Sequence, residues 1–411
     1  MSSVSATSFP AGPPAPLAAP ASEAPKRVYR VATSLTNCSE PWAIPLSHLD
    51  AKRMIDVADR TSALIPTLLK KKGMDPQAPL LYPRTLLLTP NEGNYALLTS
   101  VTHRGDRKLG SSLSKTVKCA VDLSSGELCA LGIVYRKRCS PIRWEKAKAE
   151  IETMRALKGR EGIAQIKTSY IIETGNPDTD KIYVVMEFFP RDLLAVNRDL
   201  FTRNPDAETL FQESALRQIM LDSATGLESM HHAGWMHRDL KPENIFIFTD
   251  EQDRSRAKIG DFDHACRLDD VESFKEACGS FYWISPERAQ VQILFPPSHS
   301  WEITEAKELA TATITSQSED VWSLGLIYYT LLARDSLWCC QGGGELAYHT
   351  LARVTQDAID AEVIRGLAKR DPLSPFYSNA ALLIRGMLRV NPSERLDPSA
   401  VKNFIQSHLI T

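Results

Sequence analysis

The chain has 411 residues, of which 43% are hydrophobic, and this is enough for about two to three domain-sized units that each bury a core. A net charge of −2 gives no broad basic field, so we expect no nucleic-acid partner. Eight cysteines without a Cys-x-x-Cys pair argue against a zinc site or a disulfide framework and favour a cytoplasmic protein, with the nucleus left open. No run of 18 apolar residues is present, so we expect no membrane span.

Two N-terminal segments are expected to precede the main domain. Residues 1–27 are rich in Pro, Ala and Ser and have few large apolar side chains, so we expect a disordered tail. Within residues 28–95, an apolar stripe at helical spacing over 47–72, interrupted by Pro66, predicts an N-terminal extension that is partly helical. This extension is interpreted either as a helix packed on the following domain or as an autoinhibitory or docking segment.

The rest of the chain changes its pattern once. From about residue 80, short apolar runs separated by turn signals predict strands, and from about residue 205 the apolar spacing predicts mostly helices. A strand-rich part followed by a helical part predicts an α+β chain with two unequal lobes.

Residues 237–244 carry an ordered set of chemical groups. They read His-Arg-Asp-Leu-Lys-Pro-Glu-Asn and closely match the catalytic loop of protein kinases. Residues 261–263, 279–287 and 320–325 continue the same family series in the same order. The chain therefore resembles the eukaryotic-type protein kinases, in their serine/threonine branch, over about residues 96–409.

This resemblance implies the bilobal protein-kinase fold, with a β-rich small lobe at 96–187 and a helical large lobe at 188–409. Between the family positions at residues 287 and 320 the chain is longer than usual, which predicts an insertion at about 290–316. The segment 288–319 is interpreted either as a surface loop or as an element that docks a partner or substrate.

The resemblance assigns roles to the large-lobe residues. Asp239 would orient and deprotonate the hydroxyl of a protein substrate, and Lys241 would neutralise charge on the transferring phosphoryl group of ATP. Asn244 and Asp261 would hold Mg²⁺ through oxygen ligands. Asp263 replaces the family's glycine, and we expect it to stiffen this loop.

Three further residues are expected to support this site. Ser280 stands where the family has a hydroxyl side chain that contacts the catalytic aspartate and lysine. Glu287 would be buried against an arginine, for which Arg395 is the candidate, and Asp320 would brace the catalytic loop. These motifs favour the fold more than they favour activity.

The nucleotide side departs from the family pattern. Of the glycine-rich loop only Gly110 remains, and the usual strand lysine is replaced by Gly132. The following helix keeps its glutamate, Glu150, which normally pairs with that lysine. The "with-no-lysine" kinases resemble this arrangement, because their lysine lies in the loop, where this chain has Lys115 followed by Thr-Val. Lys115 is either this phosphate-binding lysine or a solvent-exposed loop lysine.

The rest of the ATP pocket looks serviceable by resemblance, although each of its members is also interpreted as an ordinary core residue. Its expected members cover adenine from two sides, guard the back of the pocket, connect the lobes or contact the ribose: Val117, Ala130, Phe246, Met186, Glu187, Phe188 and Asp192.

The leading hypothesis is a serine/threonine protein kinase that transfers the γ-phosphate of ATP to a protein hydroxyl, with ATP and Mg²⁺ as cofactors. The alternative is a pseudokinase that acts as a binding or scaffold module. The degraded glycine-rich loop and Gly132 favour the alternative, whereas the intact set of large-lobe residues favours the enzyme.

Overall fold

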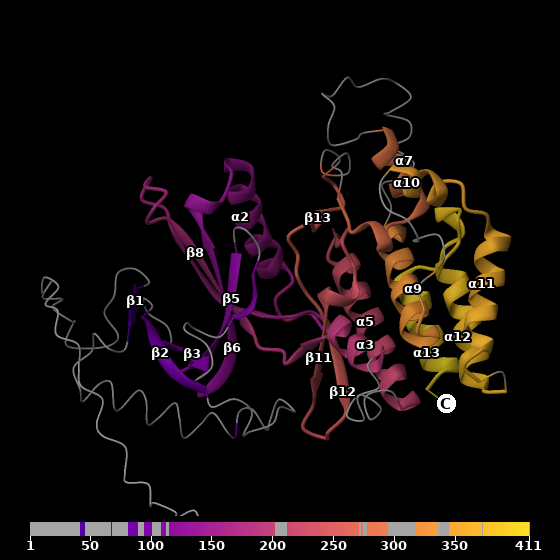
Figure 1. Ribbon diagram of the computed structural model, residues 1–411, viewed down its shortest axis with the longest axis horizontal. Helices are drawn as coiled ribbons and strands as arrows, with labels where there is room; N and C mark the ends of the chain where they lie inside the picture. Colours follow the sequence, from indigo (N-terminus) through magenta and orange to yellow (C-terminus); the bar gives the residue numbers. More distant parts are fainter. Residues whose placement is uncertain are drawn as a thin grey trace, which may run out of the picture.

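The computed structural model has two lobes, a sheet with one helix beside it and a mainly helical part (Figure 1). The residues that it describes are 42–45, 67, 81–88, 94–100, 108–111, 115–201, 212–270, 273, 278–294, 317–335, 337, 345–371 and 373–410.

The small lobe is built on an eight-stranded antiparallel sheet. Its strands are β1 (Trp42–Pro45), β2 (Leu81–Leu88), β3 (Tyr95–Ser100), β4 (Lys108–Ser111), β5 (Lys115–Asp122), β6 (Glu127–Tyr135), β7 (Ile166–Ile172) and β8 (Lys181–Glu187). Their spatial order is β1-β2-β3-β5-β6-β8-β7, and β4 pairs with β5 beside this path.

The first two strands belong to the segment predicted as an N-terminal extension, 28–95. β1 pairs with β2, and β2 pairs with β3, so these strands add to the sheet of the small lobe. The predicted helices at 47–72 and the predicted disordered tail at 1–27 lie outside the described residues, apart from Thr67.

The helix α2 (Pro141–Ala156) lies against the small-lobe sheet (Figure 1). The hydroxyl of Ser140 accepts a hydrogen bond from the backbone N–H of Arg143 at 3.2 Å and so caps the first turn. Its apolar face is buried, with Ile151 fully covered, and Glu150 is buried on the same helix. Burial of this face fixes the direction in which Glu150 points.

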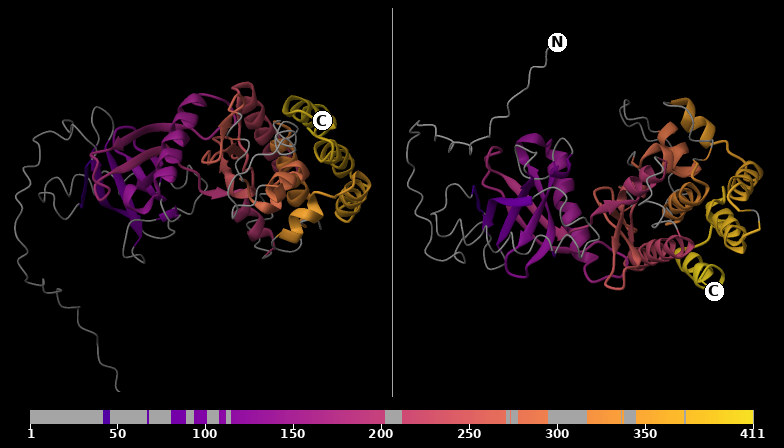
Figure 2. Two further views of the ribbon diagram at one scale, coloured as in Figure 1. Left: turned by 90° about the horizontal axis from the view of Figure 1, so that it is seen from above. Right: turned by 60° about the horizontal axis from the view of Figure 1, so that its bottom comes forward.

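The large lobe is mainly helical, and Figure 2 shows its C-terminal helices on the side away from the small lobe. Its helices are α3 (Leu193–Phe201), α5 (Glu213–His232), α7 (Pro286–Leu294), α9 (Ser318–Ala333), α10 (Glu345–Leu351), α11 (Gln356–Ala368), α12 (Pro375–Met387) and α13 (Pro398–His408). Short ladders join β9 (Arg191–Asp192) to β11 (Ile245–Thr249) and β12 (Ser255–Ile259), and β10 (Trp235–Met236) to β13 (Cys266–Arg267). Single turns of 3₁₀ helix lie at η2 (Arg136–Arg138), η4 (Pro242–Asn244), η5 (Phe281–Trp283) and η7 (Pro392–Glu394).

The helix α9 is the centre of the large lobe, because it is buried on nearly all sides and α12 and α5 pack against it. The observed order of strands and helices confirms the prediction of an α+β bilobal fold. Within the described parts of the chain, no helix has the length and apolar character needed to cross a bilayer. The predicted insertion at 290–316 is described only at its start, in α7, so a docking role for it or for the N-terminal extension stays a prediction.

Candidate active site

A cleft of about 590 Å³ lies between the two lobes. The predicted site residues that line it are Lys115, Val117, Ala130, Glu150, Met186, Glu187, Asp192, Lys241, Asn244, Phe246 and Asp261. They come from β5, β6, α2, β8, β9, η4, β11 and the segments before η4 and after β12, so residues far apart in the sequence meet here.

Three predicted site residues do not line this cleft. The side chain of Phe188 is buried in a small-lobe cluster, and the neighbouring Phe189 lines the cleft instead. The backbone of Gly110 pairs with Val117, while residues 112–114 of the predicted loop lie outside the described part. Asp239 is 5% exposed and lies beside the cleft, behind Lys241.

Lys115 and Glu150 form an ion pair, with Lys115 Nζ 2.6 Å from Glu150 Oε1. Lys115 begins β5, which runs beside β6, and Gly132 of β6 leaves room for it. A Cβ atom at Gly132 would lie 3.5 Å from Cε of Lys115, so the lysine side chain passes over the position where the family carries its own lysine. The side chain of Lys115 is only 17% exposed, so the interpretation as a solvent-exposed loop lysine does not fit.

The charge of Lys115 is stabilised where it lies. Burial disfavours the charged form, but three nearby carboxylates more than offset this and raise the pKa of the Lys115 ammonium to about 12. These are the carboxylates of Glu150, Asp261 and Asp263. Lys115 therefore presents a positive charge in the cleft at neutral pH.

A second ion pair, which the sequence analysis missed, joins α2 to the loop after β12. Arg143 Nη2 donates to Asp263 Oδ2 at 2.8 Å. Arg143 precedes Glu150 by seven residues, which is two helical turns, so both side chains leave the same face of α2. That spacing, together with an aspartate where the family has glycine, is the sequence signal for this pair.

The catalytic loop is held by Asp320, as predicted. Its carboxylate accepts hydrogen bonds from the backbone N–H groups of His237 and Arg238, both at 2.8 Å. It also pairs with Nε2 of His231 at 2.8 Å. Burial alone would raise the pKa of Asp320, but the bonds from His231 and the backbone more than offset it and lower the pKa.

The side chain of Asp239 is fixed on both oxygens. Oδ1 accepts the backbone N–H of Ser280 at 2.7 Å, and Oδ2 pairs with Lys241 Nζ at 2.5 Å. Lys241 Nζ also donates to Ser280 Oγ at 3.1 Å, so the predicted contact of Ser280 with both residues is confirmed. Burial would lower the pKa of Lys241, but Asp239 more than offsets it and raises the pKa.

Asn244 and Asp261 are suited to hold a magnesium ion. The amide Nδ2 of Asn244 donates to the backbone oxygen of Asp239 at 2.9 Å, which leaves its amide oxygen as an acceptor. The Asp261 carboxylate lines the same cleft and lies near enough to Lys115 to raise the pKa of its ammonium. An amide oxygen and a carboxylate on one cleft are the hard oxygen ligands that Mg²⁺ prefers.

The floor of the cleft is aromatic. The rings of Phe246 and Phe189 stack with centroids 5.1 Å apart and planes 5° apart. Phe189 follows Phe188 in the segment that is predicted to connect the lobes. An aromatic floor facing a cleft is a surface on which a flat heterocycle can stack.

Two predicted nucleotide contacts also have structural roles. Asp192 Oδ1 accepts the backbone N–H of Ala195 at 2.7 Å and so caps α3. Both carboxylate oxygens of Glu187 lie 2.8 Å from Lys258 Nζ, so the connector is tied to β12. A role of either residue in binding nucleotide therefore stays a prediction.

The predicted pair of Glu287 and Arg395 is confirmed. Arg395 Nη1 and Nη2 lie 2.6 and 3.1 Å from the two oxygens of Glu287, and both side chains are buried. This pair joins the start of α7 to the segment before α13.

Comparison with known proteins agrees with this geometry. The family description "Protein kinase domain" matches residues 104–407. Calcium-dependent protein kinase 27 of Arabidopsis thaliana is 25% identical over 305 residues, which is 74% of this chain and 54% of the relative. Calcium-dependent protein kinase 25 of the same plant is 29% identical over 300 residues, which is 72% of this chain and 48% of the relative.

Calcium-dependent protein kinase 6 of Oryza sativa subsp. japonica is 28% identical over 293 residues, covering 71% of this chain and 45% of the relative. The chain therefore spans about half the length of the curated relatives it matches. The domain match covers every residue that lines the cleft, but the first three strands of the small-lobe sheet lie before it. On this match, which spans residues 104–407, the chain belongs to the protein kinase family.

Proposed function

We propose that the chain is a serine/threonine protein kinase that transfers the γ-phosphate of ATP to a protein hydroxyl. One contact carries the proposal: the Lys115–Glu150 pair stands in the space that Gly132 leaves, in the cleft that Asn244 and Asp261 also line. A positive charge is therefore available on the nucleotide side although the usual strand lysine is missing.

The large-lobe residues act on the acceptor. Asp239, held by the Ser280 N–H at 2.7 Å, orients the acceptor hydroxyl and takes its proton as the bond to phosphorus forms. Lys241, 2.5 Å from Asp239, moves its charge toward the transferring phosphoryl group when the acceptor enters. The paired state of Asp239 is the resting arrangement of the site.

Lys115 acts on the donor. Its ammonium binds phosphate oxygens of the nucleotide, and Glu150 keeps the long side chain in one direction. Asn244 and Asp261 would hold Mg²⁺, which would supply positive charge beside the phosphates of the nucleotide. Phe246 and Phe189 support the adenine ring from the floor of the cleft.

The contribution of Lys115 to the rate of phosphoryl transfer decides whether this site can catalyse the reaction at an ordinary rate. Removing one charged stabiliser from a dry active site costs about 3–4 kcal/mol, or roughly 100- to 1000-fold in rate. Without Lys115 the chain would be a very weak catalyst, and with Lys115 in place an ordinary rate is expected.

The test is transfer of radiolabelled phosphate from ATP to dephosphorylated casein by the purified full chain. We expect transfer by the wild type, none by Asp239→Asn and a roughly 100- to 1000-fold loss in Lys115→Met. Lys118→Met is the matched control, because Lys118 lies on the same strand and on its opposite face. Equal rates for Asp239→Asn and wild type would refute the proposal, and equal rates for Lys115→Met and Lys118→Met would refute the role of Lys115.

The alternative is a binding module that keeps the fold without transfer. Gly132 and the loss of loop glycines after Gly110 favour it. Such a module would bind ATP in the same assay buffer and transfer nothing in any variant, which is the outcome that selects it.

A further inference from the structure

We propose that Arg288 and Gln292 of α7 are positioning residues that hold residues 278–280 beside Asp239 and so set how the acceptor hydroxyl is presented. This inference rests on the proposed function, because it concerns the acceptor side of the same site. It is carried by a continuous set of contacts from α9 through α7 to Asp239.

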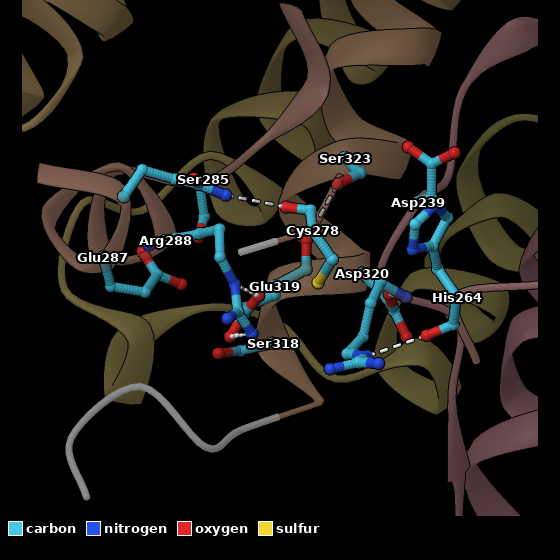
Figure 3. Close-up of polar contacts among 12 residues, drawn as sticks. Asp239, His264, Cys278, Ser285, Glu287, Arg288, Ser318, Glu319, Asp320 and Ser323 are labelled. Carbon is cyan, nitrogen blue, oxygen red and sulfur yellow. Dashed lines mark hydrogen bonds and ion pairs between the residues drawn. The ribbon is translucent and has the colours of Figure 1, made fainter. Parts of the chain in front are cut away.

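The first contact fixes α7 to α9. The guanidinium of Arg288 is buried and donates from Nε and Nη2 to the two carboxylate oxygens of Glu319 at 2.8 and 2.9 Å. Figure 3 shows these two side chains pointing toward one another, with Cys278 beside them. Two parallel bonds set direction as well as distance, and a buried charge is strongly unfavourable without its partner.

The second contact joins α7 to residues 278–280, which we call the acceptor segment. Gln292 follows Arg288 by four residues, so both side chains leave the same face of the helix. Gln292 Nε2 donates to the backbone oxygen of Cys278 at 3.1 Å, and both residues are buried. One helix face therefore binds Glu319 with one side chain and the acceptor segment with another.

The acceptor segment then passes close to the catalytic loop. Gly279 has φ +91°, and a Cβ atom there would lie 3.0 Å from the backbone oxygen of Arg238, so only glycine fits this crossing without strain. The next residue, Ser280, donates its N–H to Asp239. A shift of the Cys278 backbone would therefore move this N–H and, with it, the carboxylate that receives the acceptor.

The catalytic loop and α7 are both attached to the same helix, α9. Asp320 holds the catalytic loop, and its neighbour Glu319 holds α7, so both attachments are made at the first turn of α9. The distance between the catalytic carboxylate and the acceptor segment is thus fixed through one buried helix end. Catalytic geometry is sensitive to displacements of about 1 Å, which can lower the rate about 100-fold.

The matched experiment compares Gln292→Met with Gln290→Met in the full chain. Both variants place methionine in α7, but Gln290 is exposed and Gln292 donates to Cys278. We expect Gln292→Met to lower kcat/KM for casein about tenfold with the KM for ATP unchanged. Gln290→Met is expected to match the wild type. A general loss of folded enzyme would instead lower kcat for both substrates and leave each KM unchanged.

Amide hydrogen exchange, followed by mass spectrometry, tests the contact without any activity. We expect the amides of residues 279–280 to exchange about tenfold faster in Gln292→Met than in Gln290→Met. Arg288→Lys keeps the positive charge but loses the paired hydrogen bonds to Glu319. We therefore expect it, too, to lower kcat/KM for casein and to speed amide exchange at residues 279–280.

The outcomes separate this inference from the proposed function. Equal exchange and equal kcat/KM for casein in the two methionine variants overturn the role of Gln292, and wild-type behaviour of Arg288→Lys overturns that of Arg288. If the wild type transfers no phosphate to casein, the kinase proposal fails, and exchange at 279–280 still decides whether α7 positions this segment.

Discussion

Arg143 Nη2 donates to Asp263 Oδ2 at 2.8 Å, which joins α2 to the position where related kinases carry glycine. The Lys115–Glu150 pair holds the same face of α2 two turns further on. Asp263 therefore gives α2 a second attachment beside the cleft. The two side chains are 35% and 19% exposed, so water weakens the Arg143–Asp263 pair.

Loss of this pair is expected to reduce activity modestly. Asp263→Asn should lower kcat about two- to fivefold, because a partly exposed ion pair contributes about 0.5–1 kcal/mol. Adding Arg143→Met should cause little further loss, since the partner is already gone. The phosphate-transfer assay measures both, with Arg155→Met, an exposed residue of the same helix, as the control. Fully additive losses would show that the two residues do not act together.

Moving the lysine to the strand is expected to restore activity. Lys115→Met/Gly132→Lys should be at least about tenfold more active than Lys115→Met, because a side chain at 132 enters the space that Lys115 now fills. A Cβ atom at position 132 would lie 3.5 Å from its nearest neighbour, the Cε atom of Lys115, which is an ordinary van der Waals distance. The strand therefore need not move to accept a side chain there. Lys115→Met/Gly132→Met is the matched control and should show no recovery. Equal rates for the two double variants would contradict a charge requirement at this place.

The aromatic floor is expected to bind the adenine ring. Phe246→Ala should raise the Kd of ATP about 5- to 150-fold, since stacking of a base on an aromatic side chain contributes about 1–3 kcal/mol. Phe404→Ala is the control, because Phe404 stacks on His408 in α13 and does not line the cleft. Titration calorimetry with ATP and Mg²⁺ measures both. Similar Kd values for the two alanine variants would place adenine elsewhere.

Asp320 is expected to make stability depend on pH in acid. Its pKa is lowered from 3.8 in the folded protein, so the unfolded chain binds more protons between the two pKa values. Its contribution is complete above pH 3.8 and is lost as the pH falls through the lower folded-state pKa. Asp320→Asn should therefore lower the free energy of unfolding by about 2–3 kcal/mol at pH 7 and by progressively less in acid.

Urea unfolding between pH 7 and about pH 3 measures this difference. Asp269→Asn, at an exposed carboxylate paired with Arg267, is the control and should change stability little. A difference between wild type and Asp320→Asn that stays constant down to the lowest pH would show that the Asp320 charge is not what holds the loop.

The sequence by itself determined the fold and the order of the large-lobe motifs. Residues 237–244 are consecutive, so the backbone alone places Asp239, Lys241 and Asn244 within reach of one another. The pair Glu287–Arg395 could be predicted across a long separation, because each residue stands in a family motif. The change from strand spacing to helix spacing, with periods of 2 and 3.6, predicted the two lobes.

Only the tertiary structure decided that Lys115 pairs with Glu150 and that Asp263 pairs with Arg143. Lys115 and Glu150 are 35 residues apart, and Arg143 and Asp263 are 120 apart, so no local pattern relates them. Whether such side chains meet depends on the register of β5 on β6 and on the rotation of α2, and both are set by burial of apolar faces rather than by the charged residues themselves.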